Sequence, residues 1–493
     1  MEQFQLYAVL FTLSVVLYAW LFTKSLARKK HLPPSPPTLP VIGNLHQLGH
    51  LAHRSLRDLS MKYGPAMLLK FGSRPVLVVS SAEVAKEIMK THDLAFAGKP
   101  VLSAPKKIFY DLNDPVNLPY GDKWRKLRSI FMHELLGTSR VKSANSIREE
   151  EVALLVKKIK MSSAPVNLTH MFMTLANDFI CRASFGRKHS EMQYGARILE
   201  LIDRAVGLLF NFTLGEFVPW LSWMNWLNRF NAELDACARE IDQVMDEVLA
   251  DHLENISSGD KENFVDILLD IYKGNVSGVS IDLISVKAVI LDVLGAGTET
   301  SARTLVWIMT ELIRHPQAMK KLQDEVRETT KGKDRITDDD LRQMHYLKAV
   351  IKETFRMHPP IAIYFRAARE HVNLMGYNIE PEMMVLINAW AIGRDPTSWE
   401  VPEKFMPERF LNSSVDFRGF NFELLPFGAG RRICPGLGFA VPSIEHTVAN
   451  LIKNFDFALP GGARGEDLDA TEKPGFTVGK KEPLIVVPSC FSP

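Results

Sequence analysis

A chain of 493 residues, with 46% hydrophobic and 24% charged residues, has ordinary globular composition and ample material for a core. Its 59 Lys and Arg residues nearly balance 57 Asp and Glu residues, a formal net charge of +2, which argues against a nucleic-acid-binding protein because these carry a strong basic excess. Four cysteines without a Cys-x-x-Cys pair exclude a disulfide scaffold and argue against a structural zinc site.

Residues 1–30 have the features of a membrane anchor with a basic flank. Phe4 to Phe22 is a run of 19 residues without a charge, close to the roughly 20 apolar residues that span a bilayer. Lys24 and the run Arg28-Lys29-Lys30 follow, which favours a cytosolic location for the rest of the chain. A cleaved signal peptide is the alternative, but its charges would precede the apolar run. We therefore expect a single-pass protein in contact with membrane lipid.

Residues 31–45 read as a proline-rich hinge. Pro33-Pro34-Ser35-Pro36-Pro37 favours stiff, extended polyproline II structure. No second low-complexity break and no repeat follows, so residues 46–493 are expected to form one large domain that carries the chemistry of the protein.

The longest predicted helix covers Ser280–Arg314. Ser280 can cap it, Asp282 suits its first turn, and Pro316 lies just beyond its end. Its interior, Leu294 to Thr300, is unusual for a core helix because two glycines and two threonines weaken it.

The remaining patterns predict more helix and a few short strands. A second helix over Tyr346–Met357 stops before Pro359-Pro360. Ala66–Ser80 predicts two strands around a Gly-Ser-Arg-Pro turn, and shorter apolar runs occur at Met383–Ile387 and Leu484–Val487. The expected fold class is mainly α with small β-sheets.

The strongest chemical signal is the loop from Phe427 to Gly436, FGAGRRICPG, which satisfies F-x-x-G-x-R-x-C-x-G. A chance match somewhere in this chain is on the order of one in ten thousand. Glycines let the backbone approach a flat cofactor closely, and N–H groups at the start of the following helix can hold a thiolate ionised. This loop resembles the haem-binding loop of the cytochrome P450 family.

The resemblance implies a cytochrome P450 fold with an N-terminal transmembrane helix. It implies haem b (iron protoporphyrin IX) held by Cys434 as the metal ligand, with Phe427 and Gly436 shaping the loop. Arg432 can form a charge-assisted bond to a haem propionate. A cysteine thiolate ligand favours cleavage of the O–O bond.

Three further motifs of the family follow in the expected order. Glu353 and Arg356 fit E-x-x-R, three apart on one helical face, and Arg409 in Pro-Glu-Arg-Phe completes a triad that supports the haem pocket. Trp124 and Arg128 fit W-x-x-x-R and would reach the propionates from one helix.

Arg366 is the expected third propionate partner. Plant relatives usually carry a proline directly before this arginine, and the segment after Pro360 is one residue shorter here. Arg369 is therefore a rival for the same role.

Ala296-Gly297-Thr298-Glu299-Thr300 fits the oxygen-activating motif of the family. Small Ala296 and Gly297 are expected to let the helix widen beside the iron and leave room for dioxygen. Thr300 would hydrogen-bond the oxygen, and Glu299 would help bring protons in from solvent.

The resemblance extends over nearly the whole chain and is greatest to the plant microsomal, or A-type, group that makes specialised metabolites. By family position, seven residues are candidates for the substrate pocket, each as readily explained by core packing: Val116, Leu118, Asp292, Val293, Ile361, Ile363 and Phe476. Their apolar bias suggests a terpenoid, phenolic or alkaloid, and Asp292 could bind a cationic amine.

The expected activity is monooxygenation of a small lipophilic molecule with O2. Electrons must come from elsewhere because the chain has no flavin or nicotinamide fingerprint. The resemblance implies that NADPH is used through NADPH–cytochrome P450 reductase, on the endoplasmic reticulum membrane with the catalytic domain in the cytosol. Lys123, Arg125, Lys126 and Arg431 could meet an acidic partner. The alternatives are a haem-thiolate dehydratase or rearrangement enzyme, and a non-enzymatic haem or lipid carrier.

Overall fold

The computed structural model describes Thr12 and residues 31–209, 214–218, 229–255, 263–274 and 280–491. Apart from Thr12, the predicted anchor at residues 4–22 lies outside the described residues. Within the described ranges, no helix combines the length and the apolar character needed to cross a bilayer.

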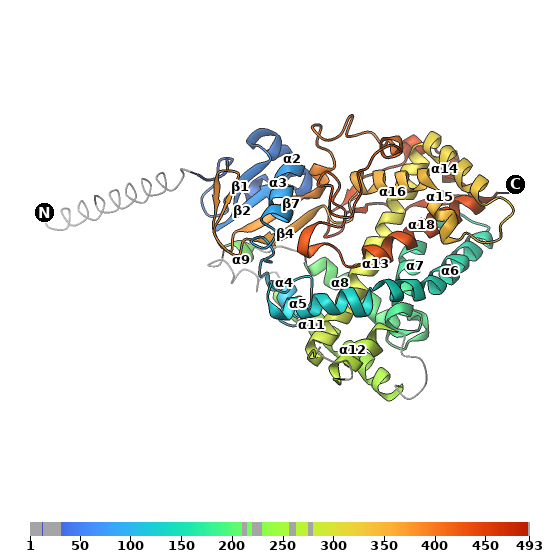
Figure 1. Cartoon of the computed structure of the whole chain (residues 1–493), viewed down its shortest axis with the longest axis horizontal. Coiled ribbons are helices and arrows are strands. Elements are labelled where there is room, and N and C mark those ends of the chain that lie inside the picture. The colour runs from blue at the N-terminus through green and yellow to red at the C-terminus, as the bar shows by residue number, and fades with distance from the viewer. Residues whose placement is uncertain are drawn as a thin grey trace.

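The fold is mainly helical, as predicted, and is organised around helix α13, Leu283–Arg314. Figure 1 shows α13 crossing the middle of the molecule. The Asp282 side chain accepts a hydrogen bond from the Ser285 N–H at 2.7 Å, so Asp282 and not Ser280 is the N-cap. An aspartate serves better here because its negative charge also faces the positive end of the helix.

Two hydrophobic clusters pack against the two halves of α13. The N-terminal half, Val286 to Leu294, packs with helices α8 (Gly195–Leu209) and α11 (Phe230–Asn255). The C-terminal half, Ala302 to Ile313, packs with helices α16 (His345–Met357) and α18 (Leu437–Asn454). Residues 295–301 belong to neither cluster. The middle of the central helix, which is made of small and polar residues, therefore adds no side chain to either cluster.

The other helices surround α13. In chain order they are α2 Ala52–Tyr63, α3 Ala82–Lys86, α4 Ser103–Ile108, α5 Asp122–Ser129, α6 Thr138–Lys160, α7 Leu168–Phe185, α8 Gly195–Leu209, α9 Leu214–Phe217, α11 Phe230–Asn255, α12 Phe264–Tyr272, α14 Pro316–Thr329, α15 Asp338–Gln343, α16 His345–Met357, α17 Ala389–Ile392 and α18 Leu437–Asn454.

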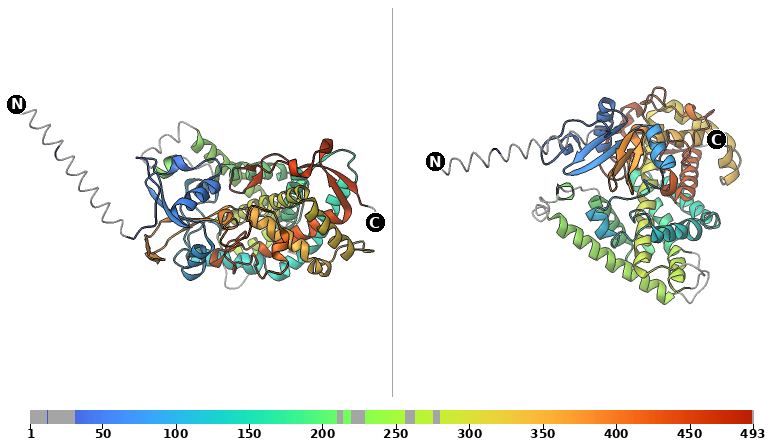
Figure 2. Two further views of the ribbon diagram at one scale, coloured as in Figure 1. Left: turned by 90° about the horizontal axis from the view of Figure 1, so that it is seen from above. Right: turned by 60° about the vertical axis from the view of Figure 1, so that its left-hand side comes forward.

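A four-stranded sheet lies at the end of the molecule opposite the C-terminus (Figures 1 and 2). Its order is β1-β2-β7-β4, with β2 and β7 parallel and the other neighbours antiparallel. The strands are β1 Ala66–Phe71, β2 Arg74–Val79, β4 Ile363–Ala367 and β7 Met384–Asn388. The predicted hairpin over Ala66–Ser80 and the strand near Met383–Ile387 are confirmed.

The smaller sheets are formed by short strands. β3 Val166–Asn167 and β8 Phe455–Ala458 flank β11 Ile485–Cys490, which confirms a strand near the predicted run at Leu484–Val487. The two-stranded pairs are β5 Val372–Leu374 with β6 Tyr377–Ile379, and β9 Glu472–Lys473 with β10 Gly479–Lys480.

The proline-rich segment lies against the sheet and does not stand free of the domain. The Leu68 N–H donates to the Pro34 carbonyl at 2.8 Å, beside strand β1. The Asn44 side chain donates to the Pro37 carbonyl at 3.1 Å and accepts from the Lys70 N–H at 2.7 Å. These bonds fix the course of the prolines on the domain surface.

Gly297 lies in close contact with α7. A Cβ at this position would lie 2.5 Å from Cδ1 of Ile180, whereas a Cβ at Gly295 would meet its nearest atom, Cγ2 of Ile202, at 4.0 Å. The two glycines thus lie on one helix in different surroundings.

We predict opposite effects of alanine at these glycines on the thermal unfolding of the holoenzyme. Gly297→Ala should destabilise the fold by about 1–3 kcal/mol because Ile180 must leave its position. Gly295→Ala should stabilise it by up to about 1 kcal/mol because alanine favours the helix. Equal shifts in Tm for the two variants would contradict this assignment.

Candidate active site

The Cys434 loop is folded by its glycines. Gly428 and Gly430 have φ of +68° and +67°, a left-handed conformation that favours glycine. A Cβ on Gly430 would lie 2.3 Å from the Met89 carbonyl oxygen. The Cys434 N–H donates to the Phe427 carbonyl at 2.9 Å, which closes the loop just before α18 begins.

Backbone donors are directed at the Cys434 sulfur. Burial raises the pKa of the thiol, and the N–H groups of Gly436 and Leu437 and the positive charge of Arg128 oppose this rise. Arg128 is itself held by a 2.6 Å hydrogen bond to the Ile433 carbonyl. The surroundings therefore favour a thiolate as soon as a cation replaces the proton.

The Cys434 loop forms one side of the candidate site, and the turn of α13 around Ala296 forms the other. Ala296 is exposed although Leu294 and Thr298 on either side are buried, so its side chain borders open space. Asp292, one turn before Ala296, acts electrostatically on Cys434, which places the two sides near each other.

The predicted local widening of α13 is wrong. The helix remains α-helical from Leu283 to Arg314, and the Thr300 hydroxyl donates to the Ala296 carbonyl at 2.7 Å. The small size of Gly297 serves contact with Ile180, whereas the small side chain of Ala296 borders the open space.

Glu299 is buried and paired. Nε of Arg303 donates to its carboxylate at 2.9 Å, and Arg303 packs over Gly479 of β10. Glu299 and Thr300, the predicted proton-delivery pair, thus lie on the same turn of α13, and Thr300 is half-buried.

Three guanidinium groups share the region between α5, β4 and the Cys434 loop. Burial lowers the pKa of all three groups, to about 10 for Arg366 and about 9 for Arg432. The positive charges of Arg128 and Arg366 lower the pKa of Arg432 further. Among the described residues, the Arg366 side chain donates one hydrogen bond, at 3.3 Å to the Phe365 carbonyl. Enclosed cations so close together require anions, and the two carboxylates of haem meet that requirement.

The structure distinguishes between Arg366 and Arg369. Arg366 is only 5% exposed. Arg369 lies on the surface, where it donates to the Leu94 carbonyl at 3.1 Å and covers the Tyr120 ring. Arg366 is therefore the one placed to meet a buried carboxylate.

Arg432 and Trp124 make contacts that the sequence did not predict. Arg432 donates to the carbonyls of Ala97 at 2.9 Å and Leu118 at 2.7 Å, and its guanidinium lies 4.6 Å from the centre of the Trp124 ring. The Trp124 indole N–H donates to Pro115 at 2.9 Å. In this geometry Trp124 supports Arg432 and has no free donor for a propionate.

Glu353, Arg356 and Arg409 lie in direct contact. Arg356 donates to both carboxylate oxygens of Glu353, at 2.7 and 2.8 Å, and Nε of Arg409 donates to one of them at 3.1 Å. Arg356 also donates to the carbonyls of Gly393 and Pro402 at 2.6 and 2.7 Å. The triad fastens α16 to the segment after α17.

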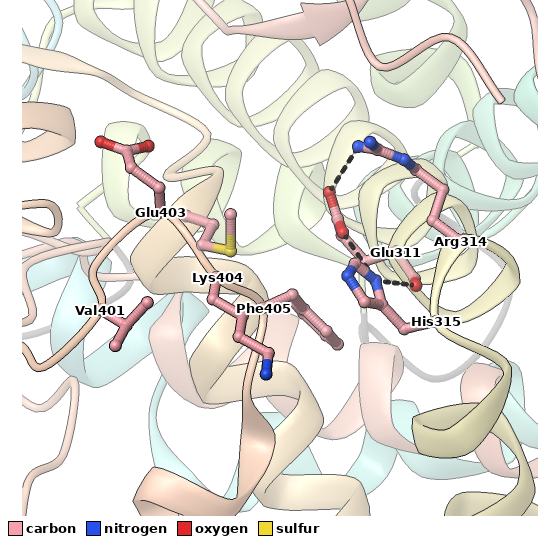
Figure 3. Close-up of a pocket in the computed structure, with 8 residues that line it drawn as sticks. Glu311, Arg314, His315, Val401, Glu403, Lys404 and Phe405 are labelled. Atoms are coloured by element: carbon pink, nitrogen blue, oxygen red, sulfur yellow. Dashed lines mark hydrogen bonds and ion pairs between the residues drawn. The ribbon is translucent and has the colours of Figure 1, made fainter. Parts of the chain in front are cut away.

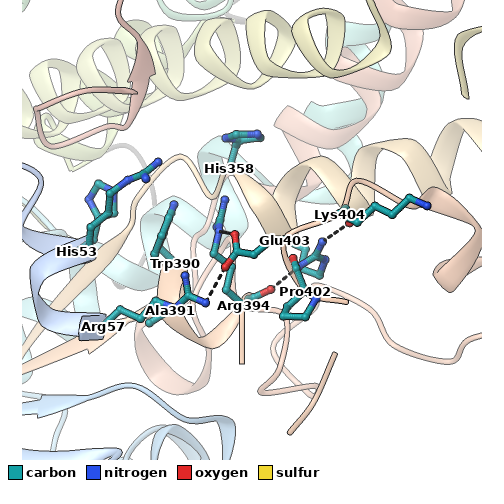
Figure 4. A network of polar contacts seen from close by, with 12 residues as sticks. His53, Arg57, His358, Trp390, Ala391, Arg394, Pro402, Glu403 and Lys404 are labelled. Carbon is teal, nitrogen blue, oxygen red and sulfur yellow. Dashed lines mark hydrogen bonds and ion pairs between the residues drawn. The ribbon is translucent and has the colours of Figure 1, made fainter. Parts of the chain in front are cut away.

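This support extends through the polar network of Figure 4. Glu403 lies between Arg57, at 2.6 Å, and Arg394, at 3.3 Å. The Arg394 guanidinium lies 3.9 Å from the centre of the Trp390 ring, which donates to Glu472 at 3.0 Å. The network joins helix α2 to the segment that carries the triad.

A separate cavity of about 380 Å³ lies below the end of α13 (Figure 3). The Glu311 carboxylate points between Arg314 and His315, at 3.7 and 3.2 Å. The lining residues are Glu311, Arg314, His315, Met357, Val401, Glu403, Lys404 and Phe405. None of the predicted site residues lines this cavity.

The predicted substrate residues fall into two groups. Val116, Leu118, Asp292 and Val293 belong to the loop before α5 and to the adjoining turn of α13. Ile361 pairs with Thr477 next to Phe476, and Ile363 begins β4.

Sequence reasoning missed two enclosed charged residues near the first group, Lys99 and Asp114. Both act electrostatically on Asp292. The Asp-Pro dipeptide at 114–115, a turn signal, was the one local indication of Asp114.

Comparison with known proteins agrees with this geometry. A sequence model of the cytochrome P450 family matches residues 33–487. The chain is 47% identical to norfluorocurarine oxidase of Strychnos over 96% of this chain and 95% of that protein. It is also 47% identical to psoralen synthase of Ammi majus, over 98% of this chain and 97% of that protein.

A zebrafish cytochrome P450 solved with abiraterone has the same fold, with a TM-score of 0.76 and 24% identity over 90% of this chain and 100% of that one. The family match, which covers the Cys434 loop, α13 and the triad alike, shows that the chain belongs to the cytochrome P450 family of haem-dependent monooxygenases.

Proposed function

We propose that the protein oxidises a small lipophilic plant metabolite, a terpenoid, phenolic or alkaloid, with O2 and with electrons from NADPH through NADPH–cytochrome P450 reductase. The observation that carries the proposal is the position of Cys434, in the loop just before α18 and close enough to α13 for Asp292 to raise the pKa of its thiol. Relatives named for norfluorocurarine and for psoralen support a specialised metabolite as the substrate.

Haem bound through the Cys434 thiolate supplies the reductive activation of dioxygen. Arg366, Arg128 and Arg432 would hold its carboxylates by charge-assisted hydrogen bonds. Phe427 supports the loop by packing against Phe355 of α16, with 5.2 Å between the ring centres. The Glu353–Arg356–Arg409 triad keeps the segment leading to this loop in place.

Proton delivery is assigned to Thr300 and Glu299. Thr300 can turn its hydroxyl from the Ala296 carbonyl toward the space beside Ala296, so it can hold a proton donor there. Glu299, held by Arg303, would pass protons inward from the side of β10. Two electrons, two protons and one O2 then yield the oxidised substrate and one water.

The reductase is assigned to the surface around α5. Lys126 is exposed and has no ion pair among the described residues. Lys123, Arg125 and Arg431 are paired with Asp282, Asp122 and Asp93, so they would have to exchange partners on binding. We place the protein, by its residues 1–30, as a single-pass component of the endoplasmic reticulum membrane with residues 46–493 in the cytosol.

The reduced carbon-monoxide difference spectrum of membranes containing the protein tests the class of iron ligand. We expect a thiolate-type Soret band that disappears in Cys434→Ala and persists in Cys490→Ala, which changes an exposed cysteine. A histidine-type band in freshly prepared, folded protein would contradict the assignment of Cys434.

Thr300→Ala tests the role of the hydroxyl. We expect product formed per NADPH to fall about tenfold or more, with release of peroxide, because the positioned proton donor beside the oxygen is lost. Thr300→Ser keeps the hydroxyl and should keep the coupling. Unchanged coupling in Thr300→Ala, or turnover that persists without oxygen, would count against the mechanism.

Arg366→Leu and Arg369→Leu form a matched pair. Loss of Arg366 should accelerate transfer of haem to apomyoglobin about tenfold, since a hydrogen bond to a charged group is worth roughly 1.5–3 kcal/mol. Loss of the exposed Arg369 should have little effect. Equal transfer rates for the two variants would show that Arg366 does not hold a propionate.

A further inference from the structure

Strand β4 directs two polar side chains toward the region between itself and the Cys434 loop. Successive side chains of a strand point to opposite faces, so Tyr364 and Arg366 share one face and Phe365 lies on the other. The packing agrees, because Tyr364 packs with the cluster that contains Leu425, whereas Phe365 packs with a different cluster. The strand thus presents a phenol on the same face as the Arg366 guanidinium.

The Tyr364 hydroxyl is bonded to the turn that leads into the Cys434 loop. It donates to the Leu425 carbonyl at 2.6 Å. The same carbonyl accepts from the Gly428 N–H at 3.2 Å, which closes a turn over residues 425–428 with Pro426 at its second position. A Cβ on Gly428 would lie 3.8 Å from the Tyr364 ring, so the ring also packs against this turn.

The 425–428 turn in its course holds the backbone of Cys434. The carbonyl of Phe427, inside the turn, accepts from the Cys434 N–H at 2.9 Å. A later part of the loop is fixed from another side, where the Asp93 carboxylate accepts from the Arg431 N–H at 3.0 Å. A phenol on β4 is therefore joined to the cysteine through one turn of backbone.

The phenol is suited to this task by its surroundings. Burial raises the pKa of Tyr364, so the hydroxyl stays protonated and remains a donor to the Leu425 carbonyl. The chain has Phe365 directly before Arg366, where plant relatives usually carry a proline. Phenylalanine does not fix the backbone angle φ as a proline ring does. The bond from Tyr364 supplies a restraint at this place that the backbone itself lacks.

We propose that Tyr364 is a positioning residue for the iron ligand, which keeps the Cys434 sulfur in the orientation that its backbone donors require. The N–H groups of Gly436 and Leu437 interact with this sulfur. Hydrogen bonds to a ligating sulfur tune the electron density that it gives to the metal. The inference rests on the proposed function, because it takes Cys434 as the ligand of the haem iron.

The test compares Tyr364→Phe with the wild type, each as the purified full-length holoenzyme in detergent. Loss of the hydroxyl leaves the Leu425 carbonyl with the Gly428 donor, so the turn is held less firmly. In the ferrous carbon-monoxide complex, the thiolate-type Soret band should convert to the histidine-type band about fivefold faster, the effect of one lost neutral hydrogen bond. The reduction potential should become more negative, because weaker N–H contacts leave more charge on the sulfur.

Tyr194→Phe is the matched control, because the Tyr194 hydroxyl donates at 3.0 Å to Asp251 of helix α11. This variant should have a lower Tm but the conversion rate and the reduction potential of the wild type. Rates are compared at the same interval below the Tm of each protein, which removes the effect of global stability. A conversion rate and a potential in Tyr364→Phe equal to those of the wild type would overturn the inference, as would equal changes in the control.

Failure of the proposed function gives a different result. A wild-type holoenzyme without a thiolate-type band would refute Cys434 as the iron ligand. A wild-type thiolate band that is lost in Cys434→Ala but responds alike to Tyr364→Phe and Tyr194→Phe would refute the role of Tyr364 alone.

Discussion

The interruption of the core along α13 is the constraint on which the rest of the structure depends. A helix of this length gains most of its stability from packing, yet residues 295–301 are small or polar and add no side chain to either hydrophobic cluster. The apolar side chains that α13 contributes to the core therefore lie in its two end sections. Ile180 against Gly297 is one of the contacts that compensate, because it brings α7 close to the central turn.

Charge burial follows from the same architecture. An interior that accepts a flat, dianionic cofactor must supply cations that remain enclosed. Burial lowers the pKa of Arg128, Arg366 and Arg432, and the charge of Arg128 lowers the pKa of the other two further. Arg128 and Arg432 also donate to backbone carbonyls, such as those of Ile433 and Ala97. These two guanidinium groups are thus oriented by the protein before any carboxylate arrives.

Local sequence predicted the parts of the site that are built from contiguous residues. This holds for the Cys434 loop, the Glu353–Arg356 pair and the motif in α13. Each consists of residues that lie within a few positions of one another, so its pattern can be recognised in the sequence alone. The N-cap was misplaced by two residues because Ser280 and Asp282 are both good caps, and only the path of the chain selects Asp282. Gly297, Trp124, Lys99 and Asp114 could not be assigned in this way, because their partners come from distant segments.

The bonds of Arg356 bear on how the chain reaches this structure. They join α16 to carbonyls 37, 46 and 48 residues further along, at Gly393, Pro402 and Lys404. Closing loops of that length costs conformational entropy before any contact forms, so such contacts form slowly. Because the Glu353–Arg356 pair lies within one helix, we expect it to form before these longer-range bonds order the segment from Gly393 to Arg409.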